Sequence, residues 1–504
     1  MRGCNGARAM KARTLSPSAV LALVAGVLFW TAYASFTRYN LDAYGDMLEN
    51  YAWGIGWQWG YSKHPPLFGW ITAAWFSILP RTDWAYYLLS ATNSGLAILV
   101  ILLVARDFMG RAHQHVLVIV AWFLPAFGFL AIKYNANAAM LPFWALCLLF
   151  YLRMLERRRL ADAVLLGVCG GLAMLAKYHS AVMILTFALF TVLDRQARPL
   201  LRTPLPWVTT VVALLVFAPH VLWLIDHDFA PIVYAASQDH GGTGAVALKL
   251  LEFTGAVIGY ALPGLLLLAA LRRWRDGNGV FHFGILPGLA RSGAGRAVLA
   301  MAAGPLILTL VIAFAMGTLV SSPWSIPFFV PLPLVLVAML DEETAEAGRV
   351  KAAIAAAVAG AALLISSPFI YESQLSRNKL HTADPLRAVA AAVETRYRDL
   401  HDAPLRIAGG DRILAFGTAF YARGDVLAAV DGNREDFHWV TPEMIARDGG
   451  AFLCAAARET CVARAERFLG RIDASEAMTF DLPAEAGVKE PLQVQVFYRA
   501  PETR

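Results

Sequence analysis

Residues 46–67 read DMLENYAWGIGWQWGYSKHPPL, a run that places two acids, a lysine and a histidine among five aromatic side chains. Asp46, Glu49 and Trp53 follow i, i+3, i+7 spacing, so on a helix they share one face. The Gly-Tyr-Ser-Lys-His-Pro-Pro segment that follows, residues 60–66, ends such a helix. We therefore expect a short helix with two carboxylates and an aromatic ring on one side, followed by an apolar segment from Leu67.

The chain around this run is dominated by apolar residues. Of its 504 residues, 58% are hydrophobic and only 16% are charged, against roughly 25% charged residues in soluble proteins. The mean hydropathy is +0.53. This composition excludes a set of soluble domains and predicts an α-helical polytopic membrane protein. With spans of about 20 residues, we expect eleven transmembrane helices, centred near residues 15–36, 85–105, 115–132, 138–152, 160–176, 179–193, 206–225, 249–271, 297–320, 325–340 and 350–368.

The basic residues orient these spans. No small-residue cleavage site follows the first apolar run, so we expect a retained first span rather than a removed signal peptide. With the N-terminus in the cytoplasm, the cytoplasmic connections collect 20 Lys and Arg residues and the opposite side collects six. Such a bias follows the positive-inside rule. An odd number of spans then places the C-terminal tail outside, on the side of the membrane opposite the cytoplasm.

The charge balance divides the chain into two parts. Residues 1–371 hold 26 Lys+Arg and 17 Asp+Glu, whereas residues 372–504 hold 17 and 20. The positive excess therefore lies between apolar segments, and no basic domain remains to bind nucleic acid. We expect residues 1–371 to form a transmembrane domain with a first periplasmic loop at 37–84. Residues 372–504 alternate strand-like and helical stretches and are expected to form a small periplasmic α/β domain.

The cysteines leave one question open. The chain has five, and none of them has zinc-finger spacing. Cys454 and Cys461 both lie in the polar tail, where a periplasmic location would permit a disulfide. Their spacing alone does not decide whether the two side chains meet.

Two interpretations of the 37–84 loop are possible from its residues. In the first, it is an interfacial loop whose Trp and Tyr side chains lie at the level of the lipid headgroups. In the second, the carboxylate pair Asp46 and Glu49, beside Lys63 and His64, performs acid–base chemistry on a lipid-linked substrate at the membrane surface. The aromatic residues fit the first interpretation one by one, whereas the clustered acids favour the second.

The stretch from Asp46 to Leu67 resembles the first periplasmic loop of bacterial GT-C glycosyltransferases. More narrowly, it resembles the family that includes protein O-mannosyltransferases, the lipid A aminoarabinose transferase and rhizobial galacturonosyltransferases. In that family an acidic motif opens the loop, and an aromatic segment leads to a Gly-Tyr-x-x-His-Pro-Pro-Leu or Lys-Pro-Pro ending. Weaker similarity follows at residues 133–137 (KYNAN) and 171–178 (GLAMLAKY), and the likeness extends over about residues 15–340.

The resemblance implies a location at the inner membrane of a bacterium, a reaction and a set of site residues. Such enzymes transfer a sugar, with inversion, from a polyprenyl-phosphate carrier to an acceptor outside the cytoplasmic membrane: lipid A or lipopolysaccharide core, another glycolipid or a protein. Asp46 would be the general base, and Glu49 would assist it or orient Lys63. Contacts to the donor phosphate or the substrates are expected from Lys63, His64, Lys177, Lys133, Tyr61 and Asn137. Each lone lysine also has the alternative of an interface anchor.

One residue departs from the family pattern. Many relatives have a Thr-Pro-Asp motif where this chain has Asn137. An amide is neither a base nor a strong metal ligand, so the carry-over of a metal is weakened. No cofactor is firmly implied, and a divalent metal stays an open question.

Other segments give weaker signals. Residues 226–247 combine acids, histidines and glycines in a loop that could close over the substrates. His220 and residues 321–324 (SSPW) could line the same cavity. The main alternative function is a transporter or flippase of a lipid-linked substrate, which would carry ionisable residues deep within its spans. The expected spans are nearly free of charge, and this favours chemistry at the surface.

Overall fold

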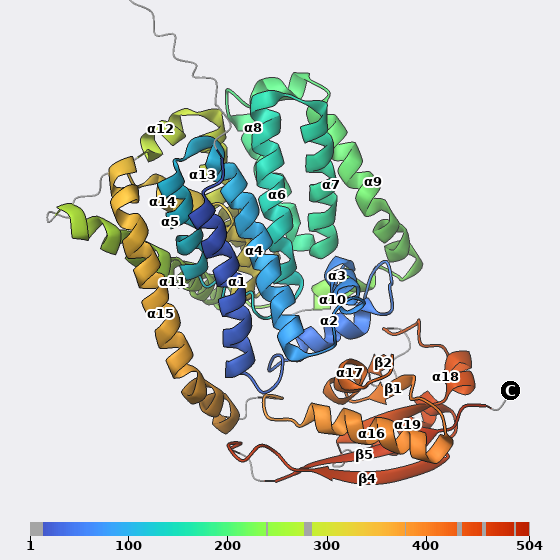
Figure 1. The fold of residues 1–504 in the computed structure, drawn as a ribbon. Helices are drawn as coiled ribbons and strands as arrows, with labels where there is room; N and C mark the ends of the chain where they lie inside the picture. The colour runs from blue at the N-terminus through green and yellow to red at the C-terminus, as the bar shows by residue number, and fades with distance from the viewer. Residues whose placement is uncertain are drawn as a thin grey trace, which may run out of the picture.

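The computed structural model describes residues 14–237, 240–276, 285–377, 380–430, 436–455, 460–487 and 490–502. Helices form a long bundle, and a small domain with a β-sheet lies against one end of it (Figure 1). The predicted fold class, an α-helical polytopic membrane protein with a small C-terminal α/β domain, is confirmed.

Within the described residues, seven helices are long and apolar enough to cross a membrane. They are α1 (Pro17–Thr37), α4 (Asp83–Phe108), α6 (Ala136–Arg157), α9 (Leu205–Asp226), α11 (Thr243–Asp276), α13 (Gly293–Met316) and α15 (Glu342–Arg377). The other four expected spans correspond to shorter elements: α5 (Arg111–Phe123), α7 (Leu160–Ala176), α8 (Ala181–Leu193), and η3 (Ser322–Phe329) with α14 (Leu332–Ala338). The count of eleven is therefore not confirmed, because these four fall below the usual spanning length.

The remaining short elements of the helical part connect the long ones. They are α2 (Asp46–Gly54), α3 (Leu67–Phe76), η1 (Tyr178–Ser180), η2 (Arg198–Arg202), α10 (Ala230–Ser237) and α12 (Leu286–Arg291). Helices α2 and α3 lie at the end of the bundle that faces the C-terminal domain (Figure 1). The residues of the expected 37–84 loop are thus an ordered structure rather than a simple connection.

Small residues allow close packing in the bundle. Gly167 and Gly171 lie one turn apart on α7, where a Cβ atom would come within 2.8 Å of Val212 and 2.6 Å of Val216 on α9. In lipid, helix association depends on such close backbone approach because hydrocarbon supplies no hydrophobic driving force between helices. Polar side chains add hydrogen bonds: buried Asn93 of α4 donates to the Ala138 carbonyl of α6 at 2.8 Å.

The C-terminal domain contains one five-stranded sheet in the order β2-β1-β3-β5-β4. β1 pairs in parallel with β2 and β3, whereas β5 pairs antiparallel with β3 and β4. The strands are β1 (Ile407–Gly410), β2 (Leu427–Val430), β3 (Gly450–Ala455), β4 (Ala474–Phe480) and β5 (Leu492–Arg499). The helices are α16 (Leu386–His401), α17 (Arg412–Tyr421), α18 (Pro442–Asp448) and α19 (Cys461–Leu469). The division expected after residue 371 falls inside α15, which continues to Arg377.

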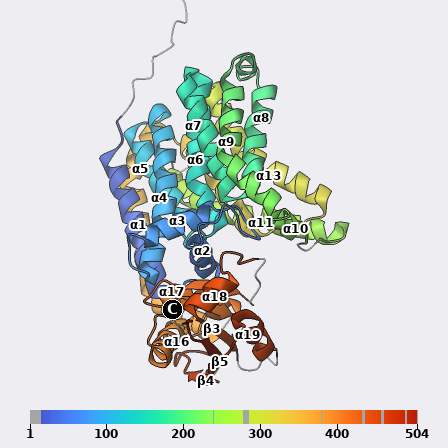
Figure 2. The ribbon, with the colours of Figure 1, turned by 90° about the vertical axis from the view of Figure 1, so that its right-hand side faces the viewer.

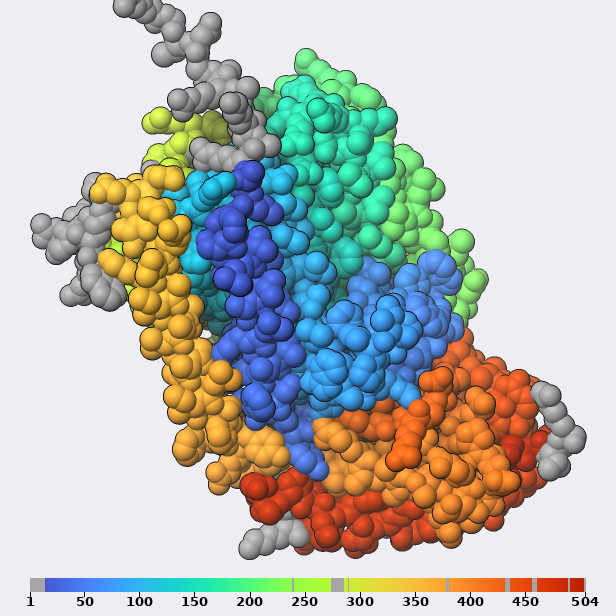
Figure 3. All heavy atoms as spheres, viewed as in Figure 1, coloured from blue at the N-terminus to red at the C-terminus, as the bar shows by residue number. Residues whose placement is uncertain are grey.

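The C-terminal domain packs directly on the segment between α1 and α4. Phe420 of α17 lies with its ring centroid 5.2 Å from those of Tyr51 and Phe76 and 5.6 Å from that of Tyr86. The neighbouring Tyr421 hydroxyl donates to the Asp83 carboxylate at 2.9 Å. Figure 2 shows α2 beside α17, and Figure 3 shows the atoms of the blue segment in contact with those of the orange domain. Aromatic edge contacts and buried hydrogen bonds therefore hold the two parts together.

A disulfide joins Cys454 at the end of β3 to Cys461 at the start of α19. The Cα atoms are 6.0 Å apart, within the usual range for such a bond. The structure thus answers the question that the spacing left open. Buried Cys147 and Cys169 are unpaired.

This bond gives the first testable prediction. Denatured protein treated with a thiol reagent should gain two labelled cysteines after reduction, counted by mass spectrometry. Cys454→Ser should remove that gain and lower the unfolding free energy of the C-terminal domain by about 2 kcal/mol, because the unfolded chain loses a short closed loop. An equal label count with and without reductant would contradict the disulfide.

Candidate active site

Asp42 organises the start of α2. The residue before α2 is Gly45, which has no side chain to cap the helix. Instead the Asp42 carboxylate accepts hydrogen bonds from the backbone N–H groups of Tyr44, Asp46 and Met47, at 2.9, 3.2 and 2.9 Å. A carboxylate at a helix N-terminus satisfies free donors and the helix dipole together. The Asp42 side chain is buried, and backbone N–H groups occupy both of its carboxylate oxygens, so its role is to hold the start of α2 in place.

Asp46 stands on the first turn of α2 with its side chain 32% exposed. Its Oδ2 atom lies 2.7 Å from the Lys133 ammonium, and its Oδ1 atom lies 3.8 Å from the Arg412 guanidinium. Asp46 is thus a partly accessible carboxylate between two cations, which distinguishes it from Asp42.

Glu49 follows one turn later on the same face, as the i, i+3 spacing predicted. Its Oε1 atom accepts from Lys63 at 2.9 Å, and its Oε2 atom accepts from Arg412 at 3.1 Å. The Lys63 ammonium also lies 5.6 Å from the Trp53 ring centroid. The expected pairing of Glu49 with Lys63 is therefore present, with both oxygens of Glu49 in use.

The ionisation of this cluster follows from its neighbours. Burial opposes ionisation of Asp46, but Lys133, Arg412 and the Asn135 amide more than offset it and hold the pKa of this carboxyl below its ordinary value. Burial opposes the charge of Arg412 too, and Glu49 and Asp46 raise its pKa despite that. At neutral pH Asp46 is therefore a carboxylate and Arg412 a cation.

The start of α6 brings a second set of predicted residues to the site. The Asn135 side chain caps α6 by accepting from the N–H groups of Asn137 and Ala138, at 3.0 and 3.3 Å. This cap places Lys133 just before the helix, opposite Asp46. It places Asn137 in the first turn, where its side-chain oxygen accepts from Lys177 at 2.6 Å.

Lys177 ends α7 beside the aromatic ring of Trp324. Its ammonium lies 4.9 Å from that ring centroid, in a cation–π arrangement. The Trp144 indole N–H donates to the Ser180 hydroxyl at 3.0 Å, which fastens the connection after Lys177 to α6. Lys177 is thus held at the site by α6 and by η3.

Within the described residues, His64 and Tyr61 lie near the carboxylate cluster and form no ion pair with it. Burial, together with the charges of Lys177 and Lys63, lowers the pKa of His64 to about 3, so its ring is neutral. Tyr61 is buried at 1% exposure, and its hydroxyl donates to the Trp53 carbonyl at 2.8 Å. The structure thus gives Tyr61 a bracing position inside the loop, and it makes His64 a neutral neighbour of the lysines rather than a cation.

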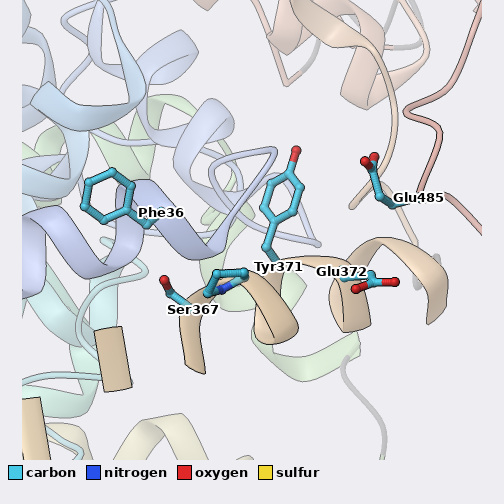
Figure 4. Close-up of a pocket in the computed structure, with 6 residues that line it drawn as sticks. Phe36, Ser367, Tyr371, Glu372 and Glu485 are labelled. Atoms are coloured by element: carbon cyan, nitrogen blue, oxygen red, sulfur yellow. The ribbon is translucent and has the colours of Figure 1, made fainter. Parts of the chain in front are cut away.

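A cavity of about 360 Å³ opens beside Lys133. Its walls include Asp42, Tyr44, Asn135 and Pro323, so it adjoins the carboxylate cluster. A second, shallower hollow of about 440 Å³ lies between α1, α15 and Glu485 (Figure 4). None of the predicted site residues lines this second hollow, so the cavity beside Lys133 is the better candidate for a reacting substrate.

The segment at 226–247 lies partly against the site. Tyr234 of α10 has its ring centroid 5.9 Å from the Lys63 ammonium. His220 fastens α9 to the first loop, with Nδ1 2.6 Å from the Trp59 carbonyl oxygen and Nε2 2.6 Å from the Tyr178 hydroxyl. Residues 238 and 239 lie outside the described residues. Trp324, from the predicted 321–324 segment, lies at the site because its ring contacts the Lys177 ammonium.

Sequence reasoning missed three residues of the cluster. Asn135 acts through a capping position that its place before the α6 run indicates in retrospect. Arg412 carries no such signal, because it comes from the C-terminal domain, far from the first loop in the sequence. Asp42 was not among the predicted site residues. Among the described residues, no group of three or more His, Cys, Asp or Glu is arranged as metal ligands.

Comparison with known proteins supports the resemblance. Residues 63–223 match the family described as dolichyl-phosphate-mannose-protein mannosyltransferase. The lipopolysaccharide core galacturonosyltransferase RgtA of Rhizobium johnstonii is 28% identical over 308 residues, 56% of each chain. The lipid A galacturonosyltransferase RgtD of the same species is 26% identical over 255 residues, 49% of this chain and 52% of its own. The chain thus matches about half the length of these relatives.

The fold also matches solved structures. ArnT from Cupriavidus metallidurans bound to undecaprenyl phosphate gives a TM-score of 0.59 at 14% sequence identity, over 96% of this chain and 99% of that one. Its apo state gives a TM-score of 0.57 at 15% identity. At this identity the likeness shows the fold. The resemblance predicted from residues 46–67 is confirmed: the chain is similar in sequence to the mannosyltransferase family and to the rhizobial galacturonosyltransferases, and it is similar in fold to ArnT.

Proposed function

We propose that this protein is a membrane glycosyltransferase that moves a sugar from a polyprenyl-phosphate carrier to a periplasmic acceptor. The observation that carries the proposal is the position of Asp46, a partly exposed, ionised carboxylate paired with Lys133, which lines a cavity. Three lysines from three separate segments lie in this region: Lys133 contacts Asp46, Lys63 pairs with the neighbouring Glu49, and the charge of Lys177 interacts with that of Asp46. This combination provides a base for an acceptor and cations for a phosphate leaving group.

The reaction balances with these groups. The acceptor hydroxyl oxygen attacks the anomeric carbon and forms the new glycosidic bond, while the bond from that carbon to the phosphate oxygen breaks. The hydroxyl proton passes to the Asp46 carboxylate. The polyprenyl phosphate leaves with the bonding electrons, and attack on the opposite face inverts the anomeric configuration.

The cations divide between two tasks. Lys133 is bound to Asp46 at 2.7 Å, so it keeps that carboxylate ionised. Within the described part of the chain, Lys177 donates a hydrogen bond to the neutral Asn137 amide and pairs with no carboxylate, so its charge is available to a phosphate. Fixed positive charge near the leaving group stabilises the transition state because no solvent has to reorganise. Glu49 holds Lys63 beside this region, and neutral His64 lies close to both lysines.

The relatives suggest the substrates. RgtA and RgtD are named for transfer of galacturonic acid to lipopolysaccharide core and to lipid A, respectively. We therefore propose galacturonic acid or a closely related sugar as the donor group, and lipid A or lipopolysaccharide core as the acceptor. The positive-inside bias supports a cytoplasmic N-terminus, which places the site and the C-terminal domain in the periplasm.

The direct test is mass spectrometry of envelope glycolipids from a strain that lacks the gene. One defined sugar should be missing, and the wild-type protein should restore it. Asp46→Asn should fail to restore it, because an amide cannot take the proton, and general-base loss costs roughly 10²- to 10⁴-fold in rate. Asp481→Asn, at an exposed position of the C-terminal domain, should restore it fully.

Two results would count against this proposal. Full restoration by Asp46→Asn would remove the assigned base. Unchanged glycolipids in the deletion strain would favour the transporter or flippase alternative.

Lys177 gives a separate prediction. Lys177→Met should reduce kcat in a membrane transfer assay by roughly 10²-fold, because removal of one preorganised donor to a developing negative charge costs that much. The matched control is Lys249→Met, which removes an exposed lysine paired with Glu252 at 2.8 Å on α11. Equal activity of the two variants would show that Lys177 is an interface anchor and not a phosphate ligand.

A further inference from the structure

One cation of the site comes from the C-terminal domain. Arg412, the first residue of α17, extends into the space beside α2. One of its nitrogens, Nη2, lies 3.1 Å from Glu49 Oε2 and 3.8 Å from Asp46 Oδ1. The other, Nη1, donates to the Tyr44 carbonyl at 2.6 Å. A single side chain therefore links both acids and the backbone just before α2.

The backbone at Arg412 is held in place by the sheet of its own domain. The preceding residue, Asp411, donates its N–H to the Leu453 carbonyl at 2.8 Å and accepts from the Ala455 N–H at 2.8 Å. Its other carboxylate oxygen accepts from Arg464 at 3.0 Å. These bonds anchor the start of α17 to β3, so Arg412 projects from a rigid support.

The backbone of the first loop is shaped for this approach. Gly45, directly before α2, has a positive φ of 73°, which L side chains rarely adopt. A Cβ atom there would lie 2.7 Å from the Cδ1 atom of Ile413, the neighbour of Arg412. Glycine therefore permits both the turn into α2 and the contact with α17.

We propose that Arg412 is a positioning residue of the transfer reaction, through which the C-terminal domain holds Asp46 and Glu49 in their working arrangement. The inference rests on the proposed function, with Asp46 as the base. Arg412 touches no reacting atom in this arrangement. It acts by fixing the two carboxylates relative to each other and by balancing their charge.

The charge count explains why a cation is needed there. Asp42 lies just before α2, and Asp46 and Glu49 lie in its first turns. Like charges this close disfavour one another's ionised forms. Lys63 serves one oxygen of Glu49, and Lys133 serves Asp46. Arg412 serves the remaining sides of Glu49 and Asp46, and its planar guanidinium presents several donors in a fixed geometry, which a lysine ammonium does not.

Loss of Arg412 changes the pKa of Asp46 in a definite direction. Its positive charge is one cause that lowers this pKa, so its removal raises the pKa toward the ordinary value. Asp46 must be ionised to accept a proton, so activity disappears as the pH falls through its pKa, and the acidic limb of the pH profile moves to higher pH. The charged or titratable groups that face Asp46 are Lys133 and Asp42, Glu49 and Lys63, His64, Lys177 and Arg412.

A chemical experiment tests this without reference to activity. A hydrophobic carbodiimide reacts with protonated carboxyl groups, and peptide mass spectrometry of residues 39–63 reports its addition at Asp46 as a function of pH. Arg412→Gln keeps an N–H donor for the Tyr44 carbonyl but removes the charge. It should raise the labelling midpoint of Asp46 by roughly one pH unit, the lower end of the shift that an opposite charge at this distance causes.

Two further variants complete the labelling experiment. Arg412→Lys keeps the charge and should have a midpoint close to the wild-type value. Arg396→Ala removes an arginine of α16 that pairs with Glu476 at 3.2 Å in the same domain, and it should leave the midpoint unchanged. An Asp46 midpoint that is the same in wild type, Arg412→Gln and Arg412→Lys would overturn the inference.

The transfer assay separates this inference from the proposed function. Arg412→Gln should lower kcat by roughly 10- to 100-fold, as expected for a displaced catalytic group, while KM stays near the wild-type value and the acidic limb moves up. Active wild-type protein with a fully active Arg412→Gln variant would refute the role of Arg412 alone. Inactive wild-type protein with a shifted labelling midpoint would refute the proposed function but leave Arg412 as the residue that sets the ionisation of Asp46.

Discussion

The candidate active site depends on one electrostatic arrangement. Two carboxylates on the first turns of α2 are enclosed by cations from three other segments. Asp46 meets Lys133 from the start of α6, and Glu49 meets Lys63 from its own loop and Arg412 from the C-terminal domain. Isolated acids in such partial burial would shift toward the protonated form. The cations keep Asp46 ionised, so the same ion pairs that join α2 to the C-terminal domain also keep Asp46 able to accept a proton.

Contacts from several parts of the fold hold the residues of this cluster in place. Asp42 holds the start of α2, Asn135 caps α6, and the Trp144–Ser180 hydrogen bond fixes the end of α7, so each functional side chain projects from a defined helix terminus. The C-terminal domain covers the loop through Phe420 and contributes Arg412.

Much of the site could be predicted from the sequence because its signals are local. The i, i+3 spacing of Asp46 and Glu49 predicted their shared face, and the motif placed Lys63, Lys133, Lys177 and Asn137 among the candidates. Arg412 could not be predicted, because its partner Glu49 lies 363 residues away in the chain and only the tertiary fold joins them. Hydropathy predicted eleven spans, and within the described residues seven of them are helices long enough to cross a membrane. The others fall on shorter elements because prolines interrupt the segment of η3 and α14, and α5 and α8 have 13 residues each. Burial, rather than residue type, decided that Tyr61 braces the loop and that His64 is neutral.

The most direct test of the central claim uses purified protein in liposomes with a polyprenyl-phosphate-linked galacturonic acid donor and a lipid A or core acceptor. The measurement is the release of polyprenyl phosphate against the sugar added to the acceptor, for wild type and for Asp46→Asn. We expect the wild-type protein to release one carrier phosphate for each sugar transferred and to form a linkage of inverted anomeric configuration. We expect no more than trace transfer by the variant. Transfer by Asp46→Asn at the wild-type rate would contradict the central claim.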